Sequence, residues 1–206
     1  MLARGTLFII SAPSGGGKTS LVTALIKQVP GIVVSVSHTT RSPRVGEVEG
    51  ENYYFVDEST FKAHQAQGLF LEHATVFNHQ YGTSKAWVLS QLNAGQDVIL
   101  EIDWQGARKV KTALACVSLF ILPPSREVLL TRLQARRQDA PAVIADRMAK
   151  ASNEIVHSTE YDYLVVNDDF DRALADIAAI VQAERLKMAS AGVRQADLLA
   201  ALTEKK

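Results

Sequence analysis

A glycine-rich segment near the N-terminus constrains the fold of this chain more than any other feature. Residues 12–19 read Ala-Pro-Ser-Gly-Gly-Gly-Lys-Thr and stand between an apolar run at 7–10 and a run of helical periodicity at 20–26. Glycines let a backbone fold closely around an anion, and the N–H groups at the start of the next helix point toward it. This order of strand, loop and helix predicts a phosphate-binding loop. In such a loop Lys18 reaches the terminal phosphates and Thr19 offers its hydroxyl to a magnesium ion.

The loop departs from the usual pattern at its first position, where this chain has alanine instead of glycine. A methyl group is a small intrusion, so we expect Ala12 to be tolerated provided that its φ angle is negative. The motif by itself predicts only that the phosphates of a nucleoside triphosphate bind, which fits an ATPase, a GTPase or a kinase. The candidate phosphate-binding residues are Ala12, Pro13, Ser14, Gly15, Gly16, Gly17, Lys18 and Thr19.

Apolar runs typical of buried strands recur along the chain and mostly alternate with segments of helical periodicity. This alternation predicts an α/β fold with a largely parallel central sheet. The expected strands cover 6–11, 32–36, 97–102, 117–122 and 163–167. The expected helices cover 18–28, 105–113, 126–136, 141–157 and 171–188.

The segment 35–95 breaks this alternation. It is polar and rich in aromatic and turn residues, and the run at 53–56 is expected to be a short strand of a small antiparallel sheet. We therefore expect a core formed by residues 1–34 and 96–206, with residues 35–95 inserted as a lobe that has a task of its own.

Composition excludes several classes of function. The chain has 22 basic and 22 acidic residues, so no overall charge draws it to nucleic acid or to a membrane surface. No apolar run approaches the length of a membrane span, and the single cysteine, Cys116, excludes a disulfide within one chain. Its apolar surroundings predict an inert cysteine in a buried strand. We expect a cytoplasmic protein that binds neither nucleic acid nor a membrane.

The C-terminal stretch is less informative. Residues 189–206 contain a potential helix breaker at Gly192, followed by several leucines and alanines. The pattern fits either a short packing helix or an interaction tail, and a homo-oligomer stays among the options.

A second informative segment places two arginines around a proline. Arg41 and Arg44 flank Pro43, and two planar guanidinium groups on a stiffened loop can grip a phosphate bidentately, which lysines cannot do with the same geometry. Tyr53 and Tyr81 can each add an O–H donor. The segment is therefore a candidate for a second phosphate site.

Together with the glycine-rich loop, this segment closely resembles the guanylate kinases, in which a Thr-x-Arg-x-x-Arg-x-Gly-Glu run leads into a tyrosine-bearing strand. Further family landmarks follow in the family's order, and the resemblance covers about residues 5–184. These landmarks are Tyr-Gly-Thr at 81–83, Ile-Asp-Trp-Gln-Gly at 102–106, Leu-Pro-Pro-Ser at 122–125 and Val-Asn-Asp-Asp at 166–169. The resemblance implies a three-layer P-loop core with a parallel central sheet, a small mixed α/β GMP-binding insertion and a helical lid at about 126–155.

The same resemblance implies a reaction, the magnesium-dependent transfer of the γ-phosphate of ATP to GMP, giving ADP and GDP in purine salvage and GTP supply. GMP, and dGMP with it, would bind in the inserted lobe. There the arginines and tyrosines hold the phosphate, while Glu72, Ser37 and Thr83 contact the base. A carboxylate suits guanine because its two oxygens match two parallel N–H groups, whereas adenine presents a lone pair. The implied GMP-binding residues are Ser37, Arg41, Arg44, Tyr53, Glu72, Tyr81, Thr83, Glu101 and Asp103.

The roles of Glu101 and Asp103 are left open by the sequence. Glu101 stands where many family members carry aspartate, so its part as a second acceptor for the base depends on one extra methylene of reach. Asp103 follows a predicted strand, where its carboxylate could order the magnesium shell or the acceptor, or make only a structural hydrogen bond.

The lid segment is locally basic, with six basic and three acidic residues between positions 126 and 150. The resemblance implies that Arg132, Arg136 and Arg147 close over the ATP phosphates and the transferring group, and that Asn167 lies near the adenine. Direct in-line attack by an anionic GMP phosphate oxygen needs neither an enzyme nucleophile nor a general base. The implied catalytic residues are Lys18, Arg41, Arg44, Arg132 and Arg147. Both the lobe and the lid are expected to move so that water is excluded.

Two alternatives were weighed against this interpretation. A non-catalytic guanylate-kinase-like peptide-binding module usually loses the phosphate loop or the acceptor arginines, whereas Lys18, Arg41 and Arg44 are present here. A related P-loop kinase with another phosphorylated acceptor is disfavoured by Glu72 and the two hydroxyl residues that accompany it.

Overall fold

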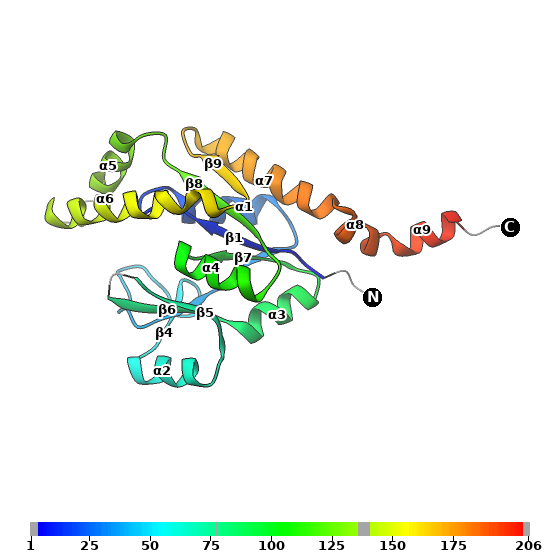
Figure 1. Cartoon of the computed structure of the whole chain (residues 1–206), viewed down its shortest axis with the longest axis horizontal. Coiled ribbons are helices and arrows are strands. Elements are labelled where there is room, and N and C mark those ends of the chain that lie inside the picture. Colours follow the sequence, from blue (N-terminus) through cyan, green and yellow to red (C-terminus); the bar gives the residue numbers. More distant parts are fainter. Residues whose placement is uncertain (1–3, 77, 136–140, 204–206) are drawn as a thin grey trace.

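Five parallel strands form the central sheet, in the order β2-β7-β1-β8-β9 (Figure 1). The computed structural model describes residues 4–76, 78–135 and 141–203. The strands are β1 (Leu7–Ser11), β2 (Ile32–Val34), β7 (Asp97–Glu101), β8 (Val117–Leu122) and β9 (Tyr163–Val166). The predicted parallel sheet is confirmed, and each strand begins and ends within two residues of its expected bounds.

Helices cover both faces of this sheet because the strands are apolar on both sides. In β1, Phe8 and Ile10 join a cluster with residues of α1 and α7, whereas Leu7 and Ile9 join a cluster with residues of α3 and α4. Successive side chains of a strand point to opposite faces, so a strand buried on both faces reads as a continuous apolar run. The result is the expected three-layer core. Its helices are α1 (Lys18–Gln28), α3 (Lys85–Asn93), α4 (Trp104–Ala113) and α7 (Phe170–Leu186).

A second sheet of four strands, in the order β4-β3-β6-β5, lies below the first in Figure 1. Its strands are β3 (Ser37–Thr39), β4 (Tyr53–Phe55), β5 (Phe70–Val76) and β6 (His79–Ser84). The expectation of an antiparallel sheet is wrong for β4, which pairs with β3 in parallel. The two strands are joined by a long loop instead of a hairpin, and a long connection permits the parallel arrangement. The other two pairs are antiparallel, so the sheet is mixed.

Two helices flank the second sheet differently. Phe61 of α2 (Glu58–Ala66) is buried and lies 4.7 Å from the ring of Phe70, so α2 belongs to the second sheet. Val88 and Leu92 of α3 instead pack with the core strands. The predicted lobe at 35–95 includes α3, although this helix packs with the core. The boundary of the lobe therefore stays a prediction.

Two helices after β8 form the segment predicted as a lid, α5 (Arg126–Ala135) and α6 (Pro141–Val156). They pack on each other through a small cluster that includes Leu129, Leu133 and Met148. This cluster is separate from the two clusters of the core. Arg136 lies outside the described residues.

The C-terminal segment leaves the body of the molecule as α8 (Met188–Arg194) and α9 (Ala196–Thr203) (Figure 1). Gly192 lies inside α8, so its interpretation as a breaker is wrong; a glycine costs a helix only about 1 kcal/mol. Cys116 was expected inside a buried strand, but it lies one residue before β8 and is only half-buried. Among the described residues, no helix is both long enough and apolar enough to cross a bilayer.

Candidate active site

The glycine-rich loop joins β1 to α1, as the sequence predicts. Gly15 and Gly17 have φ angles of 88° and 94°, a left-handed conformation that favours glycine, and the N–H of Gly16 donates to the carbonyl of Pro13 at 2.8 Å. Lys18 is the first residue of α1. Asn78 is the one described non-glycine residue with a positive φ, so Ala12 satisfies the condition set for it.

The loop is held from behind by Asn167, directly after β9. Its buried side-chain amide donates to the carbonyl of Gly16 at 2.9 Å, and the Arg132 guanidinium donates to the Asn167 carbonyl at 2.9 Å. Asn167 and Arg132 also line a cavity of about 390 Å³ next to Gly15 and Gly17. Asn167 and Arg132, both predicted to bind ATP, thus lie next to the loop, and Arg132 comes from the predicted lid. Arg147 lies half-buried on α6 and does not line this cavity.

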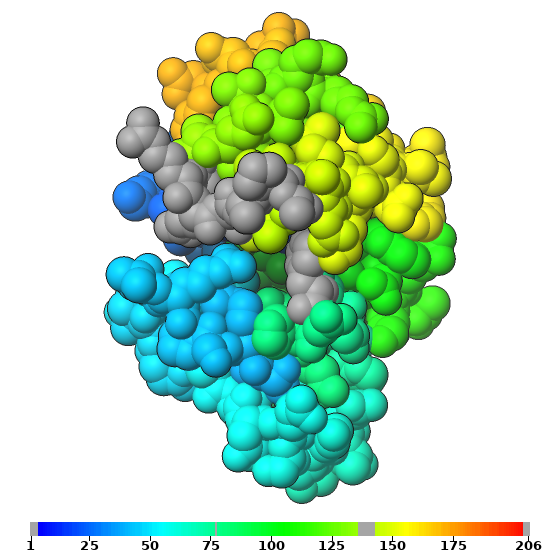
Figure 2. All heavy atoms as spheres, turned by 90° about the vertical axis from the view of Figure 1, so that its left-hand side faces the viewer, coloured from blue at the N-terminus to red at the C-terminus, as the bar shows by residue number. Residues whose placement is uncertain are grey.

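A second cavity, of about 250 Å³, lies between the loop and the second sheet. Figure 2 faces this side of the molecule, where the surface is hollowed between the blue-to-cyan segments of the second sheet and the yellow α6. The walls of this cavity thus come from the core, the second sheet and the lid. The predicted residues that line it are Ala12, Ser14, Lys18, Ser37, Arg44, Tyr53, Glu72, Tyr81, Glu101 and Asp103.

The arginine loop is organised by Glu47, a residue for which the sequence analysis assigned no role. One oxygen of its carboxylate accepts from the Arg41 guanidinium at 2.8 Å, and the other accepts from the backbone N–H of Arg44 at 2.7 Å. The Arg41 side chain is buried and its guanidinium lies 5.2 Å from the centre of the Tyr53 ring. Its hydrogen bond to Arg41 holds the pKa of Glu47 below its usual range. Glu47 thus keeps both arginines of the motif in one place.

Glu72 lies on β5 and is almost fully buried. Thr83, also buried, donates its hydroxyl to Glu72 Oε1 at 2.5 Å, so this threonine orients the carboxylate. Burial raises the pKa of Glu72 from its ordinary 4.5 to about 7, against the effect of the Thr83 hydrogen bond. A Cβ atom on Gly106 would lie 2.7 Å from Glu72 Oε2, so the glycine leaves room for the carboxylate in the position that it occupies.

Asp103 and Glu101 face the loop from the end of β7. Asp103 caps α4 by accepting from the N–H of Gly106 at 2.9 Å, so the structural role that was weighed for it is present. Glu101 Oε2 accepts from the Thr19 hydroxyl at 3.3 Å, while its Oε1 is shielded and has no hydrogen-bond partner among the described residues. Oxygen donors of this kind are the ones that Mg²⁺ prefers, so this corner of the cavity fits a magnesium ion.

The lid contributes one further carboxylate to the cavity, at a position that no sequence motif indicates. Glu154, near the end of α6, lies among the same lining residues as Lys18 and Ser14. Burial raises its pKa to about 7, although the Lys18 ammonium favours the charged form. An isolated glutamate in an amphipathic helix carries no sequence signal, because only the packing of α6 over the loop brings it there.

Comparisons with known proteins agree with this geometry. The family model described as guanylate kinase matches residues 4–184. A guanylate kinase of Alkalilimnicola ehrlichii is 59% identical over 197 residues and covers 95% of each chain, and that of Coxiella burnetii is 53% identical over 203 residues and covers 98% of each. The crystal structure of the guanylate kinase from Anaplasma phagocytophilum matches with a TM-score of 0.77 at 35% identity, over 94% of this chain and 93% of that one. By sequence and by fold, the chain belongs to the guanylate kinase family.

Proposed function

We propose that this chain transfers the γ-phosphate of ATP to GMP, giving ADP and GDP. One observation carries the proposal: Lys18 of the phosphate loop and the oriented carboxylate of Glu72 line the same cavity. A donor phosphate held by the loop and an acceptor nucleotide whose base reaches Glu72 then meet in one space.

The residues that bind GMP are proposed to contact both its phosphate and its base. Arg41, Arg44, Tyr53 and Tyr81 bind its phosphate, and Glu72 accepts from the N1–H and N2–H₂ groups of guanine. Thr83 orients Glu72, and Ser37 and Glu101 add polar contacts from the cavity wall. Contacts to the base and the phosphate do not depend on the ribose 2′-hydroxyl, so dGMP is expected to serve as well.

On the donor side, the loop at 12–19 and Asn167 hold ATP. Lys18, Arg132 and Arg147, together with the acceptor arginines, offset the charge that gathers on the transferring group. Arg136 is proposed to join them. The GMP phosphate oxygen attacks the γ-phosphorus directly, and the protein contributes position and charge instead of a covalent intermediate.

Magnesium is proposed as the cofactor. Thr19, with Glu101 and Asp103 beside it, would hold the ion, which when bound neutralises the phosphate oxygens of ATP. Residues 35–95 and the lid at about 126–155 are proposed to close over the substrates and to exclude water. We place the reaction in the cytoplasm, where GDP supplies the synthesis of GTP.

A coupled assay of ADP release tests the proposal. The purified chain is given ATP with GMP, dGMP, AMP, UMP or IMP, with and without magnesium. We expect activity with GMP and dGMP, little with AMP and UMP, and loss of activity in EDTA. ADP release with AMP at a rate equal to that with GMP would contradict the assignment of Glu72, and GMP-independent ADP release would indicate an ATPase instead.

A further inference from the structure

Ser11 is the last residue of β1 and the one polar residue among the five of that strand. Its side chain is fully buried, and its hydroxyl donates to the carbonyl of Ile102 at 2.6 Å and accepts from the Tyr161 hydroxyl at 2.8 Å. These three groups form a hydrogen-bonded chain, which we call the Ser11 relay. A buried hydroxyl adds nothing to an apolar core unless its hydrogen bonds hold something in place, so the relay points to a task beyond packing.

The bond between Ser11 and Ile102 lies where two neighbouring strands part. β1 and β7 pair in parallel up to Ile10 and Glu101, where the backbone pairing between them ends. After Ser11 the chain turns into the phosphate loop, whereas after Ile102 it continues through Asp103 into α4. The side-chain bond thus extends the pairing by one residue, at the point where the two backbones take up their separate places in the site.

Both of these backbones contribute to the wall of the central cavity. Ala12 lines it at the start of the phosphate loop, and Ile102 and Asp103 line it at the end of β7. Asp103 also accepts from the N–H of Gly106, the residue that leaves room for the Glu72 carboxylate. The relay therefore ties the segment proposed to hold the donor phosphates to the segment that supports the guanine site.

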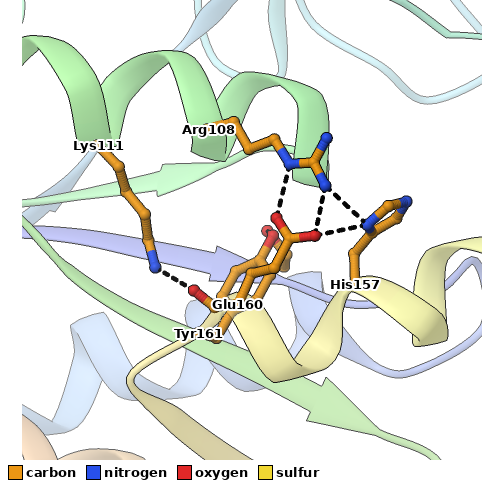
Figure 3. A network of polar contacts seen from close by, with 6 residues as sticks. Arg108, Lys111, His157, Glu160 and Tyr161 are labelled. Carbon is orange, nitrogen blue, oxygen red and sulfur yellow. Dashed lines mark hydrogen bonds and ion pairs between the residues drawn. The ribbon is translucent and has the colours of Figure 1, made fainter.

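Tyr161, at the other end of the relay, is held firmly against the core (Figure 3). Its neighbour Glu160 accepts two hydrogen bonds from Arg108 of α4, at 2.7 and 2.5 Å, and Lys111 of the same helix donates to the Glu160 carbonyl. The Tyr161 ring packs edge-on against Phe120 of β8, with the ring centres 5.1 Å apart. Burial raises the pKa of Tyr161, so its hydroxyl stays protonated and serves as a donor.

We propose that Ser11 and Tyr161 are positioning residues for phosphate transfer, because their hydroxyls fix the phosphate loop relative to the start of α4. The inference rests on the proposed function, since it takes the cavity as the place where ATP and GMP meet. Neither residue lines the cavity, so each nucleotide keeps its own contacts when the relay is broken. What changes is the alignment of the attacking oxygen with the γ-phosphorus.

The proposal predicts a loss of rate without a matching loss of affinity. A misplacement of about 1 Å between reacting groups costs about 10²-fold in rate. We expect that loss for Ser11→Ala, which leaves the Ile102 carbonyl and the Tyr161 hydroxyl without their partner, whereas the KM values for ATP and GMP stay nearly unchanged. Tyr161→Phe keeps the bond between Ser11 and Ile102, so its loss should be smaller, about tenfold.

Rapid-quench measurement of GDP formation in a single turnover tests this, together with steady-state KM values and Tm. Two matched controls lose buried or half-buried hydroxyl contacts of the same kind away from the cavity. Ser118→Ala removes a fully buried hydroxyl of β8 that donates to Asp162 Oδ2 at 2.7 Å, and Tyr163→Phe removes a hydroxyl that donates to Glu184 at 2.7 Å. Both controls should lower Tm as the relay variants do, yet leave the rate of transfer unchanged.

The double variant of Ser11→Ala and Tyr161→Phe tests the order of the relay. Because Tyr161 acts through Ser11, the double variant should transfer phosphate no more slowly than Ser11→Ala alone. Losses of rate that multiply would refute this coupling.

Other outcomes would overturn the proposal as a whole. Equal single-turnover rates in Ser11→Ala and Ser118→Ala would show that the Ser11 hydroxyl is only structural, and a raised KM at an unchanged rate would assign the relay to substrate binding. Should Ser11→Ala fail to fold, Tyr161→Phe decides, because its rate must fall below that of Tyr163→Phe. A wild type that transfers no phosphate to GMP would instead refute the proposed function.

Discussion

Replacing Glu72 with glutamine is expected to change GMP kinetics and protein stability in opposite directions, which separates the two roles of this carboxylate. The carboxylate has to be ionised to accept both guanine N–H groups, yet burial disfavours that form and raises its pKa from 4.5 to about 7. Glutamine presents one acceptor and one donor, so it opposes one guanine N–H with an N–H of its own. A mismatch in a site built for hydrogen bonds costs on the order of 10⁴-fold in kcat/KM. We expect that loss for GMP, with the KM for ATP nearly unchanged.

The free enzyme should gain stability from the same change. A carboxyl whose folded pKa is raised binds more protons in the folded than in the unfolded state between pH 4.5 and about 7, so wild-type stability falls as pH rises through that window. Each pKa unit corresponds to 1.36 kcal/mol, so the rise from 4.5 to about 7 means that the ionised group lowers the free energy of unfolding by up to about 3 kcal/mol near pH 8. Glutamine has no charge to bury and still accepts from the Thr83 hydroxyl. We therefore expect a Tm several degrees higher near pH 8 and a much smaller gain near pH 4.5.

The assay combines thermal unfolding at several pH values with GMP kinetics. Glu51→Gln is the control, since Glu51 is an exposed acid on the loop between β3 and β4. Wild-type kcat/KM for GMP should also fall as pH drops below about 7, as Glu72 becomes protonated. Equal pH dependence of Tm in wild type and Glu72→Gln, or unchanged kcat/KM for GMP, would refute the reasoning.

Two further substitutions test how the acceptor side is held. Glu47→Gln weakens the charge-assisted contact to Arg41 and the bond to the Arg44 N–H, so the KM for GMP should rise by about tenfold, with little change for ATP; equal KM values would dismiss Glu47 as an organiser. Gly106→Ala places a Cβ atom 2.7 Å from Glu72 Oε2 and should lower kcat/KM for GMP by one to two orders of magnitude, on the order of one lost hydrogen bond. Circular dichroism must show a folded variant in each case, and wild-type GMP kinetics in Gly106→Ala would mean that Glu72 is free to shift.

The central sheet could be predicted because its signals are local. Strands buried on both faces are continuous apolar runs, and the helix after the phosphate loop starts where the glycines end. The pairing of β4 could not be predicted in the same way. Three residues of β4 carry no information on the direction of β3, which precedes them by 13 residues of loop and is chosen as a partner by packing across the sheet.

In the candidate site, too, residues of local motifs could be predicted, and residues placed only by folding could not. Lys18, Arg41 and Glu72 belong to segments that are typical of a family, so their roles were open to prediction from the chain. Glu47 lay inside one of these segments, and its link to both arginines emerged only from the loop's folded shape. Glu154 lies in the predicted lid but in none of the motifs. An acid near the end of an amphipathic helix is most simply interpreted as a solvated residue, so its place in the cavity could not be predicted.

Four carboxylates line a cavity that is proposed to bring two anionic substrates together: Glu72, Glu101, Asp103 and Glu154. Near neutral pH, burial makes the ionised forms of Glu72 and Glu154 costly in the free protein. The cost at Glu72 would be recovered when a guanine donates to it, as proposed for GMP. A site built in this way is least favourable when empty and gains stability from the correct acceptor. Closure that gains stability only with the acceptor bound would keep the transferring phosphate away from water until GMP is present.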